Sequence, residues 1–324
     1  MQSVETQTNS GKLFLGIDTS CYTTSVAVIT ENGAYQLKKM LKVKSGECGL
    51  RQSDALFQHI KNIPELFDEL RKNIDFKKYT EFFVTASTRP RSVDGSYMPV
   101  FLAGQAFAKT ISDVLNAKYT EVSHQDGHIM AAIYSCKKYD LLSEPFLSVH
   151  LSGGTTEILL TKPTNSGFSC EIVGGTKDLP AGQFIDRIGV KMGMDFPCGQ
   201  YLDYLAMDYC GDKPSVKHCV HDAFINFSGE ETRFERLLES GEEHGLVAYC
   251  VMKCISDSIK CAVIDAMEKC KVSNAIMVGG VSSSGFLRQT FSEFPNVYFA
   301  QSALCCDNAV GVCELGRVVN DLKG

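Results

Sequence analysis

Apolar and polar positions follow two different periods along the N-terminal half of the chain, and these periods predict strands and helices. Residues 13–19 and 24–30 are apolar runs, each ended by a polar turn, as expected of buried strands. Residues 54–72 carry apolar side chains three and four positions apart, the spacing of a helix with one buried face. The same patterns predict a strand at 81–87, a helix at 100–115, a short strand ending at Ser123 and a helix at 124–136.

The second half alternates strands with helices. We expect strands at 170–173, 275–278 and 297–300, and helices at 180–192, 200–210, 231–240, 245–270 and 306–322. Strands followed by alternating helices and strands in both halves predict an α/β protein with two similar lobes. In such folds ligands bind at strand ends, in the crevice between the lobes.

An internal repeat supports the two-lobe prediction. The segment 14–28 recurs without a gap at 146–160, an offset of 132 residues. Five positions are identical in the two copies, and the apolar positions match in kind. Each copy predicts a strand, a turn of small residues and a second strand. Chance similarity of two hairpins is the alternative, but we interpret the repeat as a duplicated domain.

The duplication suggests a division of the chain. We expect a flexible N-terminal tail at 1–12, a first lobe at 13–140 and a second lobe at 141–305. The C-terminal helix at 306–324 would complete the first lobe.

Composition narrows the class of protein. The 324 residues are 44% apolar and 22% charged, which is ordinary for a globular protein. The net charge of −6 argues against broad nucleic-acid binding by this chain alone, although a basic partner could supply it. No segment has the ~20 apolar residues of a membrane helix, and the polar N-terminus lacks a signal-peptide core. Fourteen cysteines without any Cys-x-x-Cys spacing suggest thiols in a reducing cytoplasm.

The segment His124-Gln125-Asp126-Gly127-His128 is the sharpest local motif. On a helix, residues four apart share a face, so both imidazoles could bind one metal ion. Two solvated surface histidines are the alternative. A third ligand is needed, and Asp307 is a candidate that its local sequence alone does not select. Two histidines and a carboxylate suit Fe²⁺ or Zn²⁺.

Two glycine-rich turns could hold phosphate groups. Ser152-Gly153-Gly154-Thr155-Thr156 follows a predicted strand, and its glycines let backbone N–H groups approach oxygens. Gly279-Gly280 lies between a strand and a helix, a common approach to nucleotides. Plain turns look the same, so each signal is weak alone. Asp186 by itself resembles a solvated helix charge.

Taken in order, these segments resemble the TsaD/Gcp/Kae family, the tRNA threonylcarbamoyladenosine transferases. The resemblance extends from about Leu13 to Arg317. The matching strings, each weak alone and specific in this order, are Gly16-Ile17-Asp18-Thr19-Ser20-Cys21, His124-x-Asp126-Gly127-His128, Leu151-Ser152-Gly153-Gly154-Thr155-Thr156, Ala181-Gly182-x-x-x-Asp186-Arg187, Gly193-Met194-Asp195-Phe196-Pro197, Phe227-Ser228-Gly229, Val278-Gly279-Gly280-Val281-Ser282 and Cys306-Asp307-Asn308.

The resemblance implies a duplicated actin/hexokinase-like ATPase fold, with two RNase H-like lobes and a ligand cleft between them. His124, His128 and Asp307 would hold one iron or zinc ion. An adenine nucleotide, ATP or threonylcarbamoyl-AMP, would be bound by His150, Leu151, Ser152, Gly153, Gly154, Asp186, Gly199, Gly279, Gly280 and Ser284.

The implied reaction transfers threonylcarbamoyl from threonylcarbamoyl-AMP to N6 of the adenosine beside a tRNA anticodon. The implied partners are tRNA, a catalytically inactive homologue, a small ATPase and a separate enzyme that makes the adenylate. A dimer is also possible, and the expected location is cytoplasmic.

The chain departs from the family pattern at several positions. Tyr22-Thr23 replaces an acidic pair, Gln183 replaces an acid, and Ser284 replaces an asparagine. Arg89-Pro90-Arg91 replaces a glycine-rich loop, while Asp126 and Thr155 replace a glutamate and a histidine. The carboxylates of aspartate and glutamate can act as general bases in catalysis. Two alternatives therefore stay open: a nucleotide-binding paralogue that acts as a scaffold or regulator, and a carbamoyltransferase for a small molecule.

Overall fold

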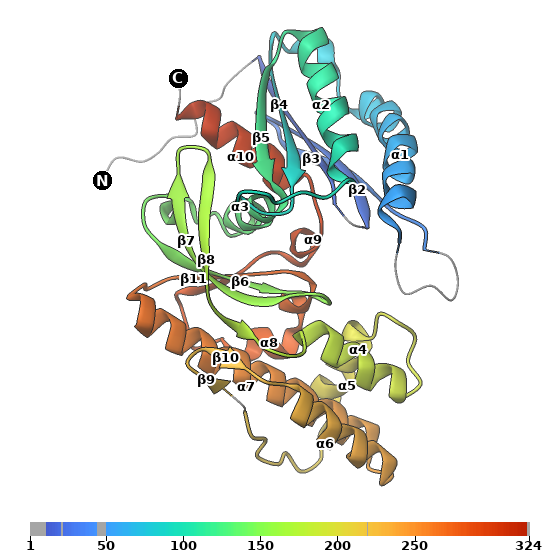
Figure 1. The fold of residues 1–324 in the computed structure, drawn as a ribbon, viewed down its shortest axis with the longest axis vertical. Helices are drawn as coiled ribbons and strands as arrows, with labels where there is room; N and C mark the ends of the chain where they lie inside the picture. Colours follow the sequence, from blue (N-terminus) through green and yellow to red (C-terminus); the bar gives the residue numbers. More distant parts are fainter. Residues whose placement is uncertain (1–10, 21, 44–49, 219, 323–324) are drawn as a thin grey trace. The chain divides into compact units, whose positions relative to one another are not determined.

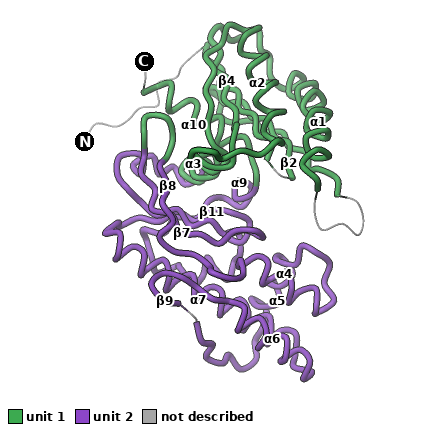
Figure 2. The backbone as a smooth tube through the Cα atoms, viewed as in Figure 1, with its two compact units in different colours: residues 1–134, 164–168, 307–324 green, residues 135–163, 169–306 purple. Residues whose placement is uncertain are grey.

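The computed structural model describes residues 11–20, 22–43, 50–218 and 220–322, and its backbone forms two compact units. Unit 1 comprises residues 1–134, 164–168 and 307–324; unit 2 comprises residues 135–163 and 169–306 (Figure 2). The expected tail at 1–12 falls outside the described residues except for Gly11 and Lys12, and Lys12 begins the first strand.

Unit 1 contains a sheet of five strands in the order β3-β2-β1-β4-β5 (Figure 1). The strands β1, β2 and β3 are antiparallel, and β4 and β5 continue the sheet in parallel with β1. The elements of this unit are β1 (Lys12–Thr19), β2 (Thr23–Thr30), β3 (Gly33–Met40), α1 (Gln52–Asn73), the 3₁₀ turn η1 (Phe76–Lys78), β4 (Glu81–Arg89), α2 (Phe101–Leu115), β5 (Lys118–Ser123), α3 (His124–Cys136) and α10 (Val310–Asp321).

Successive side chains of β1 point to opposite faces of the sheet, and nearly all of them are buried. Both faces are therefore covered by helices. Leu13, Leu15 and Ile17 lie in a core with Leu66 and Leu70 of α1 and with buried residues of β2, β4 and α2. The helix α10 packs against the opposite face of β1. At Gly16 a Cβ atom would lie only 2.6 Å from the carbonyl oxygen of Ala309, so a glycine is needed for this approach.

Unit 2 contains a sheet in the order β12-β11-β6-β7-β8-β10-β9, with a core of its own between the sheet and its helices. Its elements are η2 (Tyr139–Leu142), β6 (Phe146–Leu151), β7 (Thr156–Thr164), β8 (Gly167–Thr176), α4 (Ala181–Lys191), α5 (Gly199–Asp208), β9 (Val220–His221), β10 (Phe224–Ile225), α6 (Ser228–Glu239), α7 (His244–Cys270), β11 (Ala275–Val278), η3 (Gly280–Ser283), α8 (Gly285–Thr290), β12 (Val297–Phe299) and α9 (Ser302–Cys305). The tip of the β7–β8 hairpin, residues 164–168, belongs to unit 1.

The internal repeat has the same strand register in both units. In the β1–β2 hairpin Asp18 pairs with Ser25, and in the β6–β7 hairpin His150 pairs with Glu157. Each pair in one hairpin maps onto the pair found 132 residues later in the other. A one-residue slip would turn every side chain to the other face, so an identical register supports duplication over chance.

The structure corrects two predictions from the sequence. The closing helix does not begin at 306 but at Val310. Asn308 lies before the helix, and its side chain accepts the N–H of Gly311 in the first turn at 3.0 Å. The strand expected at 170–173 is part of the longer β8, and β3 was not expected at all. None of the helices in the described part combines the length and apolar character that crossing a membrane demands.

Candidate functional site

The helix α3 begins with a capping box that holds its first turn. The N–H of Asp126 donates to Oγ of Ser123 at 3.0 Å, and the N–H of Ser123 donates to Oδ2 of Asp126 at 3.2 Å. Ser92 donates a third hydrogen bond to Oδ2 of Asp126 at 2.6 Å. These bonds fix the start of α3, which is where His124 and His128 project from one face.

Three side chains of types that can bind a metal ion meet in unit 1. His124 Nε2 lies 3.0 Å from His128 Nε2, and Asp307 Oδ1 lies 3.5 Å from the first and 3.4 Å from the second. His128 is buried, while His124 and Asp307 are 20% and 27% exposed. Asp307 can reach the cluster because it lies in the non-helical segment before α10.

This triangle of donor atoms fits a divalent metal ion. Metal–nitrogen and metal–oxygen bonds of about 2.0–2.2 Å at tetrahedral or octahedral angles separate donors by about 3.0–3.5 Å. Two imidazole nitrogens and one carboxylate oxygen are also the donor set of Zn²⁺ and non-heme Fe²⁺ sites. The three residues predicted from the sequence are therefore brought together within one unit.

Asp18 lies behind the cluster at the carboxyl end of β1. Its Oδ1 atom is 3.0 Å from Nδ1 of His124 and also accepts the hydroxyl of Ser87 from the end of β4. The Asp18 side chain is completely buried. Neither Asp18 nor Ser87 was assigned to the site from the sequence, although Asp18 belongs to the strand-end motif Gly16-Ile17-Asp18.

Burial and neighbouring charges shift the pKa values of His124 and Asp307 in opposite directions. Burial alone lowers the pKa of His124, but the carboxylates of Asp18 and Asp307 outweigh it, and the pKa lies well above its ordinary value. Burial raises the pKa of Asp307, but its contacts with His124 and His128 outweigh it, and the pKa lies well below its ordinary value. Without a metal ion the cluster therefore favours an imidazolium beside two carboxylates, and a metal ion must displace that proton.

His59 is a buried polar residue near the cluster that sequence reasoning missed. The Nδ1 atom of His59 lies 2.8 Å from the hydroxyl of Thr24, which also accepts from Asn62 Nδ2 at 3.1 Å. Burial lowers the pKa of His59, and the negative charge of Asp18 opposes this only in part. The available signal was a histidine on the apolar face of the helix predicted at 54–72.

In unit 2, the predicted glycine-rich turn connects β6 to β7. The Oγ atom of Ser152 accepts the N–H groups of Gly154 at 3.4 Å and Thr155 at 3.1 Å, which closes the turn on itself. At Gly153 and Gly154 an added Cβ would meet no atom within 4 Å, so both glycines border open space.

The turn packs against the N-terminus of α4. The Gly182 N–H donates to the carbonyl oxygen of Ser152 at 3.3 Å, and the Ala181 N–H donates to Oγ1 of Thr156 at 2.8 Å. A Cβ on Gly182 would lie 2.6 Å from that same carbonyl oxygen, which explains the Ala-Gly pair. The dipole of α4 thus points at the turn, which favours an anion there.

The second glycine pair differs at its two positions. Gly279 has φ +91°, and its Cβ would overlap the carbonyl of Leu151, the residue after His150 on β6. A Cβ atom added to Gly280 would have one neighbour within 4 Å among the described residues, the sulfur of Cys306 at 3.9 Å. Gly279 therefore serves packing between β6 and β11, whereas Gly280 leaves room for a ligand.

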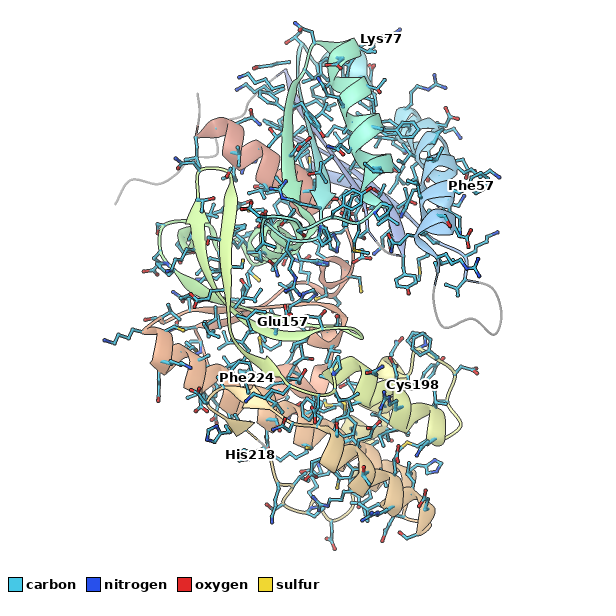
Figure 3. The ribbon with its side chains drawn as sticks, in the orientation of Figure 1. Phe57, Lys77, Glu157, Cys198, His218 and Phe224 are labelled. Atoms are coloured by element: carbon cyan, nitrogen blue, oxygen red, sulfur yellow. The ribbon has the colours of Figure 1, made fainter. Side chains whose placement is uncertain are left out.

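Asp186 and Ser284 have partners that the sequence did not reveal. Asp186 on α4 accepts the N–H of Cys198, the residue before Gly199 (Figure 3), at 2.8 Å, and burial raises its pKa. Ser284 donates to Asp203 at 2.5 Å and accepts from Leu287 N–H at 3.1 Å, so its hydroxyl caps α8. The nucleotide candidates all lie in unit 2, and the metal candidates all lie in unit 1.

Comparison with solved structures identifies the class of fold. HypF of T. kodakarensis aligns with a TM-score of 0.59 and 13% identity, over 99% of this chain and 49% of its own. The chain thus spans about half the length of HypF. The activator of 2-hydroxyisocaproyl-CoA dehydratase from Clostridium difficile, solved with bound ADPNP, aligns with a TM-score of 0.52 and 12% identity, over 96% of this chain and 97% of its own. The predicted actin/hexokinase-like ATPase fold class is confirmed.

The family follows from the sequence match. Residues 13–312 match the TsaD family, described as tRNA N6-adenosine threonylcarbamoyltransferase, and the chain belongs to this family of transferases. The enzyme of that name from Persephonella marina is 28% identical, over 93% of this chain and 88% of its own. The one from Thermodesulfovibrio yellowstonii is also 28% identical, over 94% and 93% of the two chains.

Proposed function

We propose that this protein transfers a threonylcarbamoyl group from threonylcarbamoyl-AMP to N6 of the adenosine beside the anticodon of tRNA. One Fe²⁺ or Zn²⁺ ion would be held by His124, His128 and Asp307. The observation that carries the proposal is the triangle of their donor atoms, with sides of 3.0–3.5 Å. Membership of a family whose relatives bear the name of this activity supports it.

The proposed reaction joins the exocyclic nitrogen of adenosine to the carbamoyl carbon. The bond from that carbon to the phosphate oxygen breaks, AMP leaves, and the nitrogen loses a proton. A bound metal ion would supply Lewis-acid polarisation and a template for substrate oxygens. The three protein ligands leave further coordination positions for such oxygens.

Unit 2 carries the nucleotide-binding part of the proposal. The turn Ser152-Gly153-Gly154 and the N-terminus of α4 would bind the phosphate, because both glycines border open space and the dipole of α4 favours negative charge there. Asp186 would accept hydrogen bonds from ribose hydroxyls. The remaining proposed contacts are His150, Leu151, Gly199, Gly279, Gly280 and Ser284. The Ser284 hydroxyl donates one hydrogen bond and accepts one, so its oxygen can accept one more.

The test is mass spectrometry of nucleosides from unmodified tRNA. The tRNA is incubated with this protein, threonylcarbamoyl-AMP and its partner proteins, and in parallel with a characterised relative and its partners. Threonylcarbamoyladenosine that depends on this protein, and is lost with a metal chelator, supports the proposal. No product while the relative is active would contradict transfer to tRNA.

Two observations favour a second candidate function, a nucleotide-binding paralogue that regulates or scaffolds a partner. The Ser284 hydroxyl is already bonded to Asp203 and Leu287. Gln183 lies in the first turn of α4, at a position where the resemblance to the family implies an acid. Calorimetric binding of ATP or AMP together with no product in the tRNA assay is the expected result for this alternative.

The proposal includes partners and a location. The net charge of −6 leaves tRNA binding to a complex, which we propose contains an inactive homologue and a small ATPase. A cytoplasmic location is proposed because every cysteine among the described residues is a free thiol. Co-purification from cells with tagged protein tests both the complex and any dimer.

A further inference from the structure

The carboxylate of Asp18 is placed to orient one of the proposed metal ligands. Its Oδ1 atom lies 3.0 Å from Nδ1 of His124, and a carboxylate at this position accepts hydrogen bonds but donates none. The hydroxyl of Ser87 donates to the same oxygen atom. The proton in the Asp18–His124 contact therefore belongs to Nδ1 of the imidazole.

This contact selects the form of His124 that a metal ion requires. A neutral imidazole with its proton on Nδ1 has a lone pair on Nε2. Nε2 is the atom of His124 that faces His128 Nε2 and Asp307 Oδ1. A hydrogen-bonded outer partner of this kind fixes the tautomer and ring orientation of a ligating histidine.

The Asp18 side chain is completely buried, and its Oδ2 atom has no hydrogen-bond partner among the described residues. Leaving a buried acceptor atom unpaired costs free energy that packing alone does not return. The contacts that hold this side chain in place are those of Oδ1, with His124 and with Ser87.

We propose that Asp18 is a positioning residue of the metal centre, which acts by presenting Nε2 of His124 to the metal ion. This inference rests on the proposed metal centre. Removing an outer partner of a ligating histidine typically weakens metal binding by about 10–100-fold. The same loss is expected for the Asp18→Asn variant.

The first measurement is titration of the full-length protein with Co²⁺, followed by its visible absorption spectrum. Asp18→Asn should bind Co²⁺ about 10–100-fold more weakly and with an altered spectrum. Ser25→Ala is the matched control, because the Ser25 hydroxyl bonds, among the described residues, to the backbone oxygen of Asp18 at 3.5 Å and not to its carboxylate. It should keep wild-type affinity and spectrum. Circular dichroism checks that each variant is folded.

The second measurement uses the wild-type protein, so it does not depend on whether a variant folds. Nitrogen-15 NMR of the histidine-labelled, Zn²⁺-loaded protein should show His124 protonated at Nδ1 and coordinated through Nε2. The Nδ1–H resonance should shift or vanish in Asp18→Asn.

Three outcomes separate the hypotheses. Coordination of His124 through Nδ1, or a folded Asp18→Asn variant with wild-type Co²⁺ affinity and spectrum, overturns the role of Asp18 and leaves the metal centre standing. A wild-type protein that binds neither Co²⁺ nor Zn²⁺ overturns the proposed metal centre, and this inference with it.

Discussion

Ser123 and Asp126 exchange two reciprocal hydrogen bonds across the first turn of α3, at 3.0 and 3.2 Å. The pair is buried and stands at the junction between β5 and α3. Because His124 and His128 project from this first part of the helix, the capping box links local helix stability to the geometry of the proposed metal centre.

Removal of the Ser123 hydroxyl should affect stability and metal binding together. The Ser123→Ala variant should lower the free energy of unfolding by about 1 kcal/mol, the usual cost of losing a capping side chain. It should also weaken Co²⁺ binding, since the first turn of α3 then frays. Urea denaturation and Co²⁺ titration measure the two effects. Thr110→Ala, which removes an exposed hydroxyl inside α2, should change neither; an unaltered Ser123→Ala variant would show that the box is dispensable.

The two glycines after β11 should respond oppositely to alanine. Gly279→Ala places a Cβ against the Leu151 carbonyl at φ +91°, and should lower the free energy of unfolding by at least about 2 kcal/mol. In Gly280→Ala the new Cβ makes an ordinary van der Waals contact with the Cys306 sulfur at 3.9 Å, so this variant should stay folded but bind ATP or AMP more weakly, as measured by calorimetry. Unchanged nucleotide affinity in Gly280→Ala would argue against a ligand beside η3.

Loss of one of the three proposed metal ligands should lower metal content and activity together. His128→Ala should lower metal content and threonylcarbamoyladenosine formation by more than the about 10–100-fold cost of an outer partner. Inductively coupled plasma mass spectrometry and the nucleoside assay measure both quantities. His244→Ala, which removes an exposed histidine at the start of α7, is the control. A metal-free His128→Ala enzyme with full activity would rule out the metal-dependent mechanism.

The buried histidine His59 should make folding stability depend on pH. Its pKa in the folded protein is lowered by burial, so near and below the ordinary value of about 6.5 the unfolded chain binds more protons than the folded one. The contribution of His59 to stability should therefore fall as the pH falls through about 6.5, opposite in sign to that of His124, whose pKa is raised, and this contribution should be absent in His59→Gln. Urea unfolding at several pH values between 5 and 8 tests this. An equal slope in wild type and variant would show that His59 contributes none of the dependence.

Several elements could be predicted from the sequence because their signal is local. The hairpins of the repeat, the helix at 54–72 and the buried strand at 275–278 carry strong apolar periods. The strand β3 was missed because it is an edge strand, and its exposed and partly buried residues give no clear alternation. The start of α10 was placed too early because the segment before Val310 contains Asp307 and Asn308, and the Asn308 side chain bonds to the first turn from outside the helix.

The sequence by itself determined the fold class, the duplicated hairpins and the helical spacing of His124 and His128, since each is a pattern of residue types along the chain. Only the tertiary structure decided that Asp307 reaches these histidines and that Asp18 backs His124 from a position 106 residues away along the chain. The sequence around an aspartate does not indicate which distant residue its carboxylate contacts. Its contacts arise when β1, α3 and the segment before α10 pack around one buried core, where an unpaired charge is too costly to leave alone.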